Sequence, residues 1–81
     1  MKLVFVLSAL ALSACSASDS SVYTLYRNSA AGADMRLHVA TFDSTDGEAY
    51  NSENCRTAMG LFQRQPGVTV KFWCEKGRFR K

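Results

Sequence analysis

The chain has 81 residues, a formal net charge of +3 at pH 7, one histidine and three cysteines. A chain of this length holds one domain at most, and so small a domain buries only about 60% of the surface that its unfolded chain exposes. The sequence has neither a Gly-x-Ser-x-Gly elbow nor grouped glycines that cradle a phosphate, and the chain is too short to enclose a substrate pocket. These properties argue against an enzyme, so no catalytic residue is assigned.

The chain begins with the features of a signal peptide. A basic start at Lys2 precedes an apolar run over residues 3–14, which is too short to cross a bilayer. The run ends in Leu12-Ser13-Ala14-Cys15, the leucine, two small residues and cysteine of a lipobox. This combination resembles bacterial lipoprotein precursors. The alternatives are an ordinary secretory signal and a buried helix that ends in a cysteine.

The resemblance implies the fate of this end of the chain. In lipoprotein precursors the cysteine thiol receives a diacylglyceryl group, and a peptidase then cuts the peptide bond before it. Residues 1–14 would be removed, and Cys15 would become a lipid-modified first residue with an acylated amine. This covalent lipid is the only non-protein group expected, and no cofactor is assigned. Because Ser16 replaces the aspartate that favours inner-membrane retention, the outer membrane, facing the periplasm, is the expected location in a host with two membranes.

Residues 15–21 carry small polar side chains after the cysteine and lack apolar periodicity, as is typical of a flexible tether. Six residues reach at most about 20 Å when fully extended. The folded part, expected over residues 22–75, is therefore predicted to stay near the bilayer.

Lipidation of Cys15 would leave Cys55 and Cys74 as an even pair. A small exported domain is expected to carry a disulfide, because its core alone contributes little stability. The helix after Cys55 would cover about 15 Å and the strand returning to Cys74 about 20 Å, so the two residues come to a similar level. The sequence predicts a structural Cys55–Cys74 disulfide. A redox-active pair would need the closer Cys-x-x-Cys spacing.

Two strands are predicted in the first half of the domain. Residues 22–27 are β-branched and aromatic, and the turn-rich stretch 28–34 separates them from an alternating stretch over 35–42. Alternation assigns the second strand two faces, one with Met35, Leu37, Val39 and Thr41, and one with Arg36, His38, Ala40 and Phe42.

A helix is predicted next. In the loop 43–48, Thr45 and Glu48 have capping-box spacing, and Asn51 is a later N-cap candidate. The helix ends at the Gln-Pro-Gly of residues 65–67. Its apolar stripe consists of Cys55, Ala58, Met59 and Phe62, with Leu61 beside it.

Residues 68–74 alternate again and predict a third strand, which leaves 76–81 as a basic tail. The expected fold is α+β: a three-stranded sheet in the order β-β-α-β with one helix packed on one face and a disulfide between them. Because parallel strand pairs are usually buried on both faces, we expect the first strand in the middle, antiparallel to both others.

Residues 40–77 resemble small uncharacterised bacterial envelope lipoproteins. The resemblance implies a location and no reaction, since those proteins bring no assigned activity with them. The matching pieces are Ala40-Thr41-Phe42-Asp43, Tyr50-Asn51, Glu53-Asn54-Cys55 and Phe72-Trp73-Cys74-Glu75-Lys76-Gly77.

The sheet face that the helix leaves uncovered is the candidate binding surface. Aromatic and basic side chains gather there, and such side chains stack against a glycan, pair with an anionic headgroup or contact an envelope protein. The alternative is that half of any two-sided sheet looks like this, with Trp73 only shielding the disulfide. The candidate residues are Tyr26, Arg36, His38, Phe42, Lys71 and Trp73.

No metal site is assigned. A lone histidine, His38, without a free cysteine beside it makes a poor metal site. The acids in residues 43–48 do not fit a calcium loop, because Gly47 at its fixed position would put Phe42 at the first ligand position. We interpret these acids as residues that favour a helix start.

Charge is unevenly distributed: five of the seven acids lie between residues 34 and 53, while residues 56–81 hold seven basic residues and one acid. A basic end can meet anionic headgroups, whereas an envelope location makes nucleic acid a poor partner. The predicted function is a lipid-anchored binding or accessory module of the cell envelope. The rival is a phage-derived exclusion or lysis factor that blocks an envelope protein, and an enzyme is a distant third.

Overall fold

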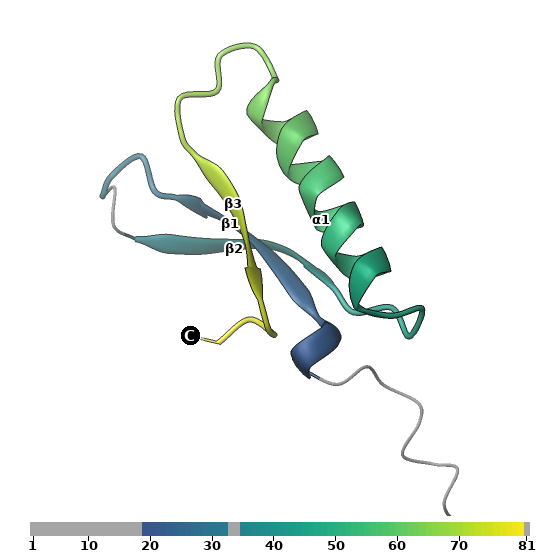
Figure 1. Ribbon diagram of the computed structural model, residues 1–81. Helices are drawn as coiled ribbons and strands as arrows, with labels where there is room; N and C mark the ends of the chain where they lie inside the picture. Colours follow the sequence, from purple (N-terminus) through teal and green to yellow (C-terminus); the bar gives the residue numbers. More distant parts are fainter. Residues whose placement is uncertain (1–18, 33–34, 81) are drawn as a thin grey trace, which may run out of the picture.

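The computed structural model describes residues 19–32 and 35–80 (Figure 1). The predicted signal peptide, the predicted lipobox with Cys15 and the first part of the predicted tether lie outside these residues. In chain order, the elements are a 3-10 turn η2 (Asp19–Ser21), strands β1 (Tyr23–Asn28) and β2 (Arg36–Phe42), helix α1 (Glu48–Gln63) and strand β3 (Phe72–Lys76). No helix in the described part of the chain has the length and apolarity needed to cross a membrane.

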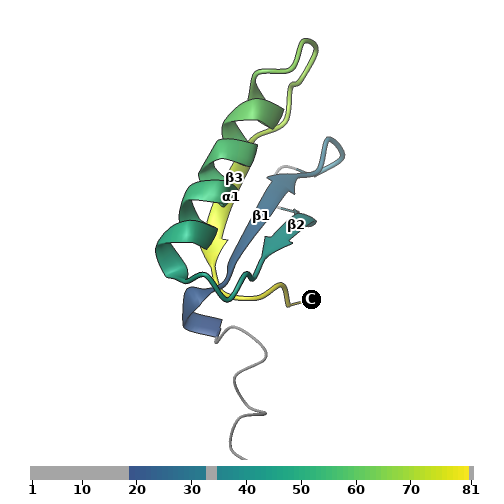
Figure 2. The same ribbon diagram turned by 90° about the vertical axis from the view of Figure 1, so that its right-hand side faces the viewer.

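The three strands form a sheet in the order β2-β1-β3, in which β1 pairs antiparallel with both neighbours. Helix α1 lies along one side of the sheet (Figures 1 and 2). The predicted α+β fold and the central position of the first strand are therefore confirmed. Because β1 is central, its middle residues Thr24, Leu25 and Tyr26 are all buried, which suits its β-branched and aromatic composition.

A β-bulge interrupts the pairing of β1 with β2. Leu25 lies opposite Ala40, but the next residue, Tyr26, lies opposite His38, so Val39 is the extra residue. One extra residue reverses the alternation of side chains beyond it. The prediction that Phe42 shares a face with His38 is wrong for this reason, since Phe42 lies on the side of the helix.

Helix α1 begins without the predicted side-chain cap. Its N-cap is Gly47, with φ of 115°, a backbone conformation that favours glycine, and no side chain caps the helix. The expectations of a capping box from Thr45 to Glu48 and of an N-cap at Asn51 are therefore wrong. Glu48 still lies in the first turn, where a negative charge favours a helix start.

Helix α1 ends at Gln63, whose side chain organises the entry to the third strand. The Gln63 amide donates to the carbonyl oxygen of Val70, and its oxygen accepts from the backbone N–H of Phe72, both at 2.8 Å. These bonds occupy backbone groups just before and at the strand start. Strand β3 accordingly begins four residues later than predicted and continues through Lys76.

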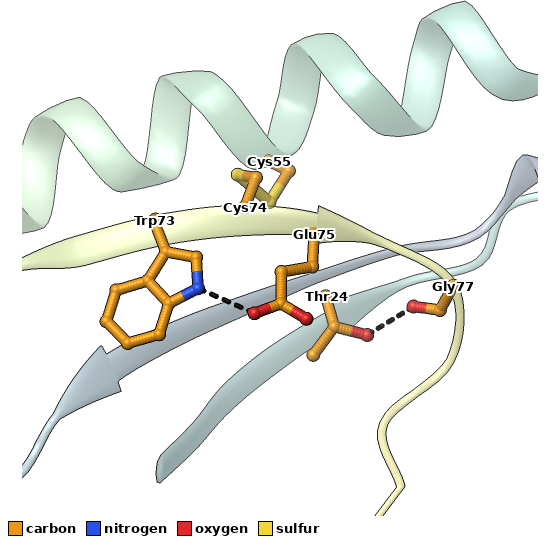
Figure 3. The surroundings of a disulfide bond; sticks show 6 residues. All are labelled: Thr24, Cys55, Trp73, Cys74, Glu75 and Gly77. Atoms are coloured by element: carbon orange, nitrogen blue, oxygen red, sulfur yellow. Dashed lines mark hydrogen bonds between the residues drawn. A yellow bond between two sulfur atoms is a disulfide. The ribbon is translucent and has the colours of Figure 1, made fainter. Parts of the chain in front are cut away.

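The predicted disulfide joins Cys55 of α1 to Cys74 of β3, with a Cα–Cα distance of 6.2 Å (Figure 3). Cys55 is fully buried and Cys74 pairs with the buried Leu25 of β1, so the bond lies at the centre of the domain. Trp73 projects from the opposite side of β3 (Figure 3). The interpretation of Trp73 as a shield over the disulfide is therefore wrong.

Candidate functional site

Four of the six predicted surface residues come together on the sheet face remote from α1. Tyr26 of β1 lies between His38 of β2 and Trp73 of β3, because these three residues are register partners. Arg36, two residues before His38 on β2, places its Cζ atom 4.3 Å from the centre of the Tyr26 ring. We call this side of the sheet the aromatic face.

Tyr26 is at the centre of the aromatic face but is not available to a ligand. Its ring stacks on that of Trp73, with a centroid distance of 6.2 Å and an interplanar angle of 28°. Together with Arg36 and Phe79, Trp73 leaves Tyr26 only 2% exposed. Tyr26 therefore supports the surface from below, and the exposed contacts belong to its neighbours.

Phe79 completes the aromatic face, although the sequence predicted only a basic tail there. Its ring centroid lies 4.6 Å from that of His38, and Phe79 as a whole is 36% exposed. A turn at Gly77, with φ of 111°, redirects the chain after β3. The Gly77 N–H donates to the Val22 carbonyl at 2.6 Å, and its carbonyl accepts from the Thr24 hydroxyl at 2.7 Å. A single aromatic residue two positions after this glycine was the available signal.

Glu75 makes the aromatic face nearly neutral. One carboxylate oxygen pairs with Arg36 at 2.5 Å, and the other accepts a hydrogen bond from the Trp73 indole N–H at 2.8 Å. The Arg36 and Glu75 side chains are about two-fifths exposed. The face therefore offers aromatic edges and an exposed ion pair, and not a free positive charge.

Lys71 and Phe42 do not join this cluster. Lys71 precedes β3, and its backbone N–H donates to the side chain of Asn28 at 2.6 Å, while its own side chain is exposed. Phe42 instead lines a groove of about 490 Å³ beside α1, together with residues such as Tyr50 and Ala58. The candidate surface thus loses two predicted residues and gains Glu75 and Phe79.

The basic end of the chain is paired with acids. Lys76 contacts the Glu48 carboxylate at 2.9 Å, and Arg80 contacts Asp19 at 2.7 Å. Arg78 bridges Asp19 and Asp43, each at 3.2 Å. Residues 76–80 are consequently part of the folded domain and not the separate tail that we predicted.

The contact between Lys76 and Glu48 shifts the pKa values of both groups. Hydrogen bonds from Lys76 and Tyr23 hold the pKa of the Glu48 carboxyl below its usual value, and the hydrogen bond to Glu48 raises the pKa of Lys76.

The domain begins earlier in the chain than predicted. The turn η2 and the ion pairs of Asp19 place residues 19–21 in the domain, where a tether was expected. Asp19 thus pairs with Arg78 and Arg80 and offsets part of the positive charge at the C-terminal end.

The acidic residues in the described part of the chain do not gather into a metal centre. Residues 19–32 and 35–80 contain no group of three or more His, Cys, Asp or Glu side chains able to hold a metal ion. His38 lies 2.7 Å from the hydroxyl of Thr41, and Asp46 accepts a hydrogen bond from Ser44. The groups considered for metal binding therefore have protein partners.

Comparisons of the chain with models of protein families, with curated proteins and with solved structures find no match. The functional argument accordingly depends on the residues of this chain alone.

Proposed function

We propose that the protein is a lipid-anchored accessory module of the cell envelope that binds a partner protein through its aromatic face. The observation that carries the proposal is the position of Asp19. This residue follows the lipobox cysteine by four positions and is already fixed to the domain by Arg78 and Arg80. Four residue steps span at most about 14 Å. A lipid on Cys15 would therefore hold the domain directly at the bilayer surface.

The composition of the aromatic face supports a protein partner. Exposed Arg36 and the partly exposed Trp73 and Phe79 are residue types that are enriched at protein interfaces. An anionic headgroup needs free cations, whereas Arg36 is neutralised by Glu75. The face therefore suits a protein better than a lipid headgroup.

The anchor is tested by Cys15→Ser. We expect the variant to lose palmitate labelling and to accumulate as the uncleaved precursor, because the thiol that takes the lipid is gone. Labelling with a palmitate analogue, followed by gel mobility and membrane fractionation, measures both effects. A matched Ser13→Ala change keeps a small residue in the lipobox and should be processed normally. Efficient cleavage of Cys15→Ser at the same site would sink the lipoprotein assignment.

The binding face is tested by Arg36→Gln. We expect capture of cross-linked envelope proteins from membranes to fall by about tenfold if Arg36 contributes as an interface residue. The thermal midpoint should fall only modestly, since the exposed ion pair contributes about 0–1 kcal/mol and the cation–π contact with Tyr26 about 0.5–1 kcal/mol. Arg56→Gln is the matched control, because Arg56 is exposed on α1, away from the aromatic face. Quantitative mass spectrometry of the captured proteins gives the result. Equal capture by the two variants would contradict this use of the face.

A further inference from the structure

The segment just before β3 has the composition of a strand but lies outside the sheet. Residues 68–71, Val-Thr-Val-Lys, are mostly β-branched, and their alternation continues through Phe72 and Trp73. Strand β3 nevertheless starts at Phe72. Strand β1 ends at Asn28, which is bonded to Lys71, so residues 68–70 extend past the end of β1. A strand-forming segment is thus left without a neighbouring strand.

This segment leads into an outer edge of the sheet, because β3 has a neighbour, β1, on one side only. The Lys71 N–H donates to the Asn28 side chain at 2.6 Å, and the Lys71 carbonyl accepts from the Asn28 N–H at 3.1 Å. Since successive backbone groups of an extended chain alternate in direction, the Val70 carbonyl and the Phe72 N–H point away from β1. Outward groups of this kind are the template on which another chain adds a strand.

Gln63, the last residue of α1, occupies both of these outward groups. Its side-chain N–H donates to the Val70 carbonyl and its side-chain oxygen accepts from the Phe72 N–H, each at 2.8 Å. One amide therefore bridges two alternate residues, as the backbone of a neighbouring strand does. The ring of the preceding residue, Phe62, stacks on that of Phe72 with a centroid distance of 5.4 Å, so the end of α1 contacts the start of β3 twice.

The two edges of the sheet differ in how they are closed. Strand β2 carries the bulge at Val39, and bulges are one means by which proteins prevent an edge strand from pairing with another chain. The register of β3 with β1 is regular from Phe72 to Lys76. At this edge, the Gln63 amide provides the protection that the bulge provides at the other.

We infer that Gln63 caps the outer edge of β3 and prevents residues 68–73 from pairing with the same residues of a second copy of this chain. The six residues combine high β propensity with a single charge and contain neither proline nor glycine, which is the composition of segments that stack on identical copies. The inference goes beyond the proposed function and does not depend on it, since Gln63 belongs to α1 and not to the aromatic face.

The test uses the full chain, expressed with its own signal peptide, extracted from membranes in detergent and kept oxidised. Size-exclusion chromatography with light scattering, over a range of protein concentrations, measures association. Gln63→Ala raises the association constant by about tenfold or more, because two hydrogen bonds no longer compete with a second chain. Gln65→Ala is the matched control. It removes an exposed amide two residues later, at a residue that contacts its neighbours through backbone groups, and leaves association unchanged.

A second substitution identifies the segment that pairs and separates pairing from misfolding. Thr69→Lys places a charge at an exposed position within residues 68–73 and leaves Gln63 untouched. Added to Gln63→Ala, it returns association to the wild-type level, because like charges then meet along the edge. A Gln63→Ala chain that is only misfolded does not recover in this way. Unchanged association of Gln63→Ala, equal association of Gln65→Ala, or failure of Thr69→Lys to suppress association overturns the inference.

Discussion

Replacing Cys55 and Cys74 together by alanine lowers the free energy of unfolding by about 2–5 kcal/mol, the range found when a native disulfide is removed from a small exported domain. The two residues are 19 positions apart, and closing a loop of about this length accounts for about 3 kcal/mol in the chain-entropy model. The loss is large for this domain, because few side chains share the core with Cys55. The fully buried ones are Val22, Thr24, Leu25 and Asn51.

Urea denaturation of the oxidised protein, with and without reductant, measures this effect. In the oxidised protein neither Cys55 nor Cys74 should react with a maleimide until reductant is added. The double alanine variant serves as the control, since reductant should leave its midpoint unchanged. A reductant-insensitive midpoint in the wild-type protein would show that the disulfide does not stabilise the fold.

Asn51→Ala should lower the free energy of unfolding by about 3 kcal/mol, because buried polar groups that lose their partners cost about 1–3 kcal/mol each. The Asn51 amide donates to the carbonyl oxygens of Ser21 and Ser44, at 2.7 and 3.0 Å. Its oxygen accepts from the Ser44 N–H at 3.0 Å. One side chain, 1% exposed, therefore joins η2, the loop after β2 and the first turn of α1.

Two variants isolate the role of this amide. Asn51→Asp keeps the acceptor for Ser44 but puts a charge against two carbonyl oxygens, so it should destabilise at least as strongly as Asn51→Ala. Asn54→Ala, three residues further along α1 at a partly exposed position, should change stability by less than about 0.5 kcal/mol. Hydrogen exchange should also accelerate at the Ser44 amide in Asn51→Ala. Unchanged protection at Ser44 would contradict the proposed bridging role.

The fold was predictable because the sequence marks it by the periodicity of apolar residues and by the spacing of its cysteines. Alternation marked the strands, the interval between Cys55 and Cys74 matched a helix followed by a returning strand, and a single helix left one face of the sheet open. The bulge at Val39 has no such signal, since neither glycine nor proline marks it. That one residue moved Phe42 from the predicted surface to the side of the helix.

The candidate site was predictable where the register was regular. The pairing of Tyr26 with His38 and of Asn28 with Arg36 lies in the regular part of the ladder, before Val39 on β2. Alternation therefore placed Tyr26, His38 and Arg36 on the correct face. Phe79 was missed because its position depends on the turn at Gly77 and on hydrogen bonds to Val22 and Thr24, which are distant in sequence. The buried side of α1 was predicted in part: Cys55 of the predicted apolar stripe is fully buried, and Phe62 stacks on Phe72. The burial of Asn51 was missed, because a polar residue is buried only when its partners satisfy it, and those partners, Ser21 and Ser44, lie outside the helix.

The central position of β1 determines how the domain would respond to a mechanical load. A lipid on Cys15 would transmit any pull from the membrane into the start of β1, along the axis of a strand that is bonded on both sides. Such a pull shears two hydrogen-bond ladders at once, whereas the same pull on an edge strand would open one ladder bond by bond. The ion pairs of Asp19 with Arg78 and Arg80 would transmit part of this force to the C-terminal segment. If the proposed lipid anchor and partner pull against each other, we expect a domain anchored through this central strand to stay folded.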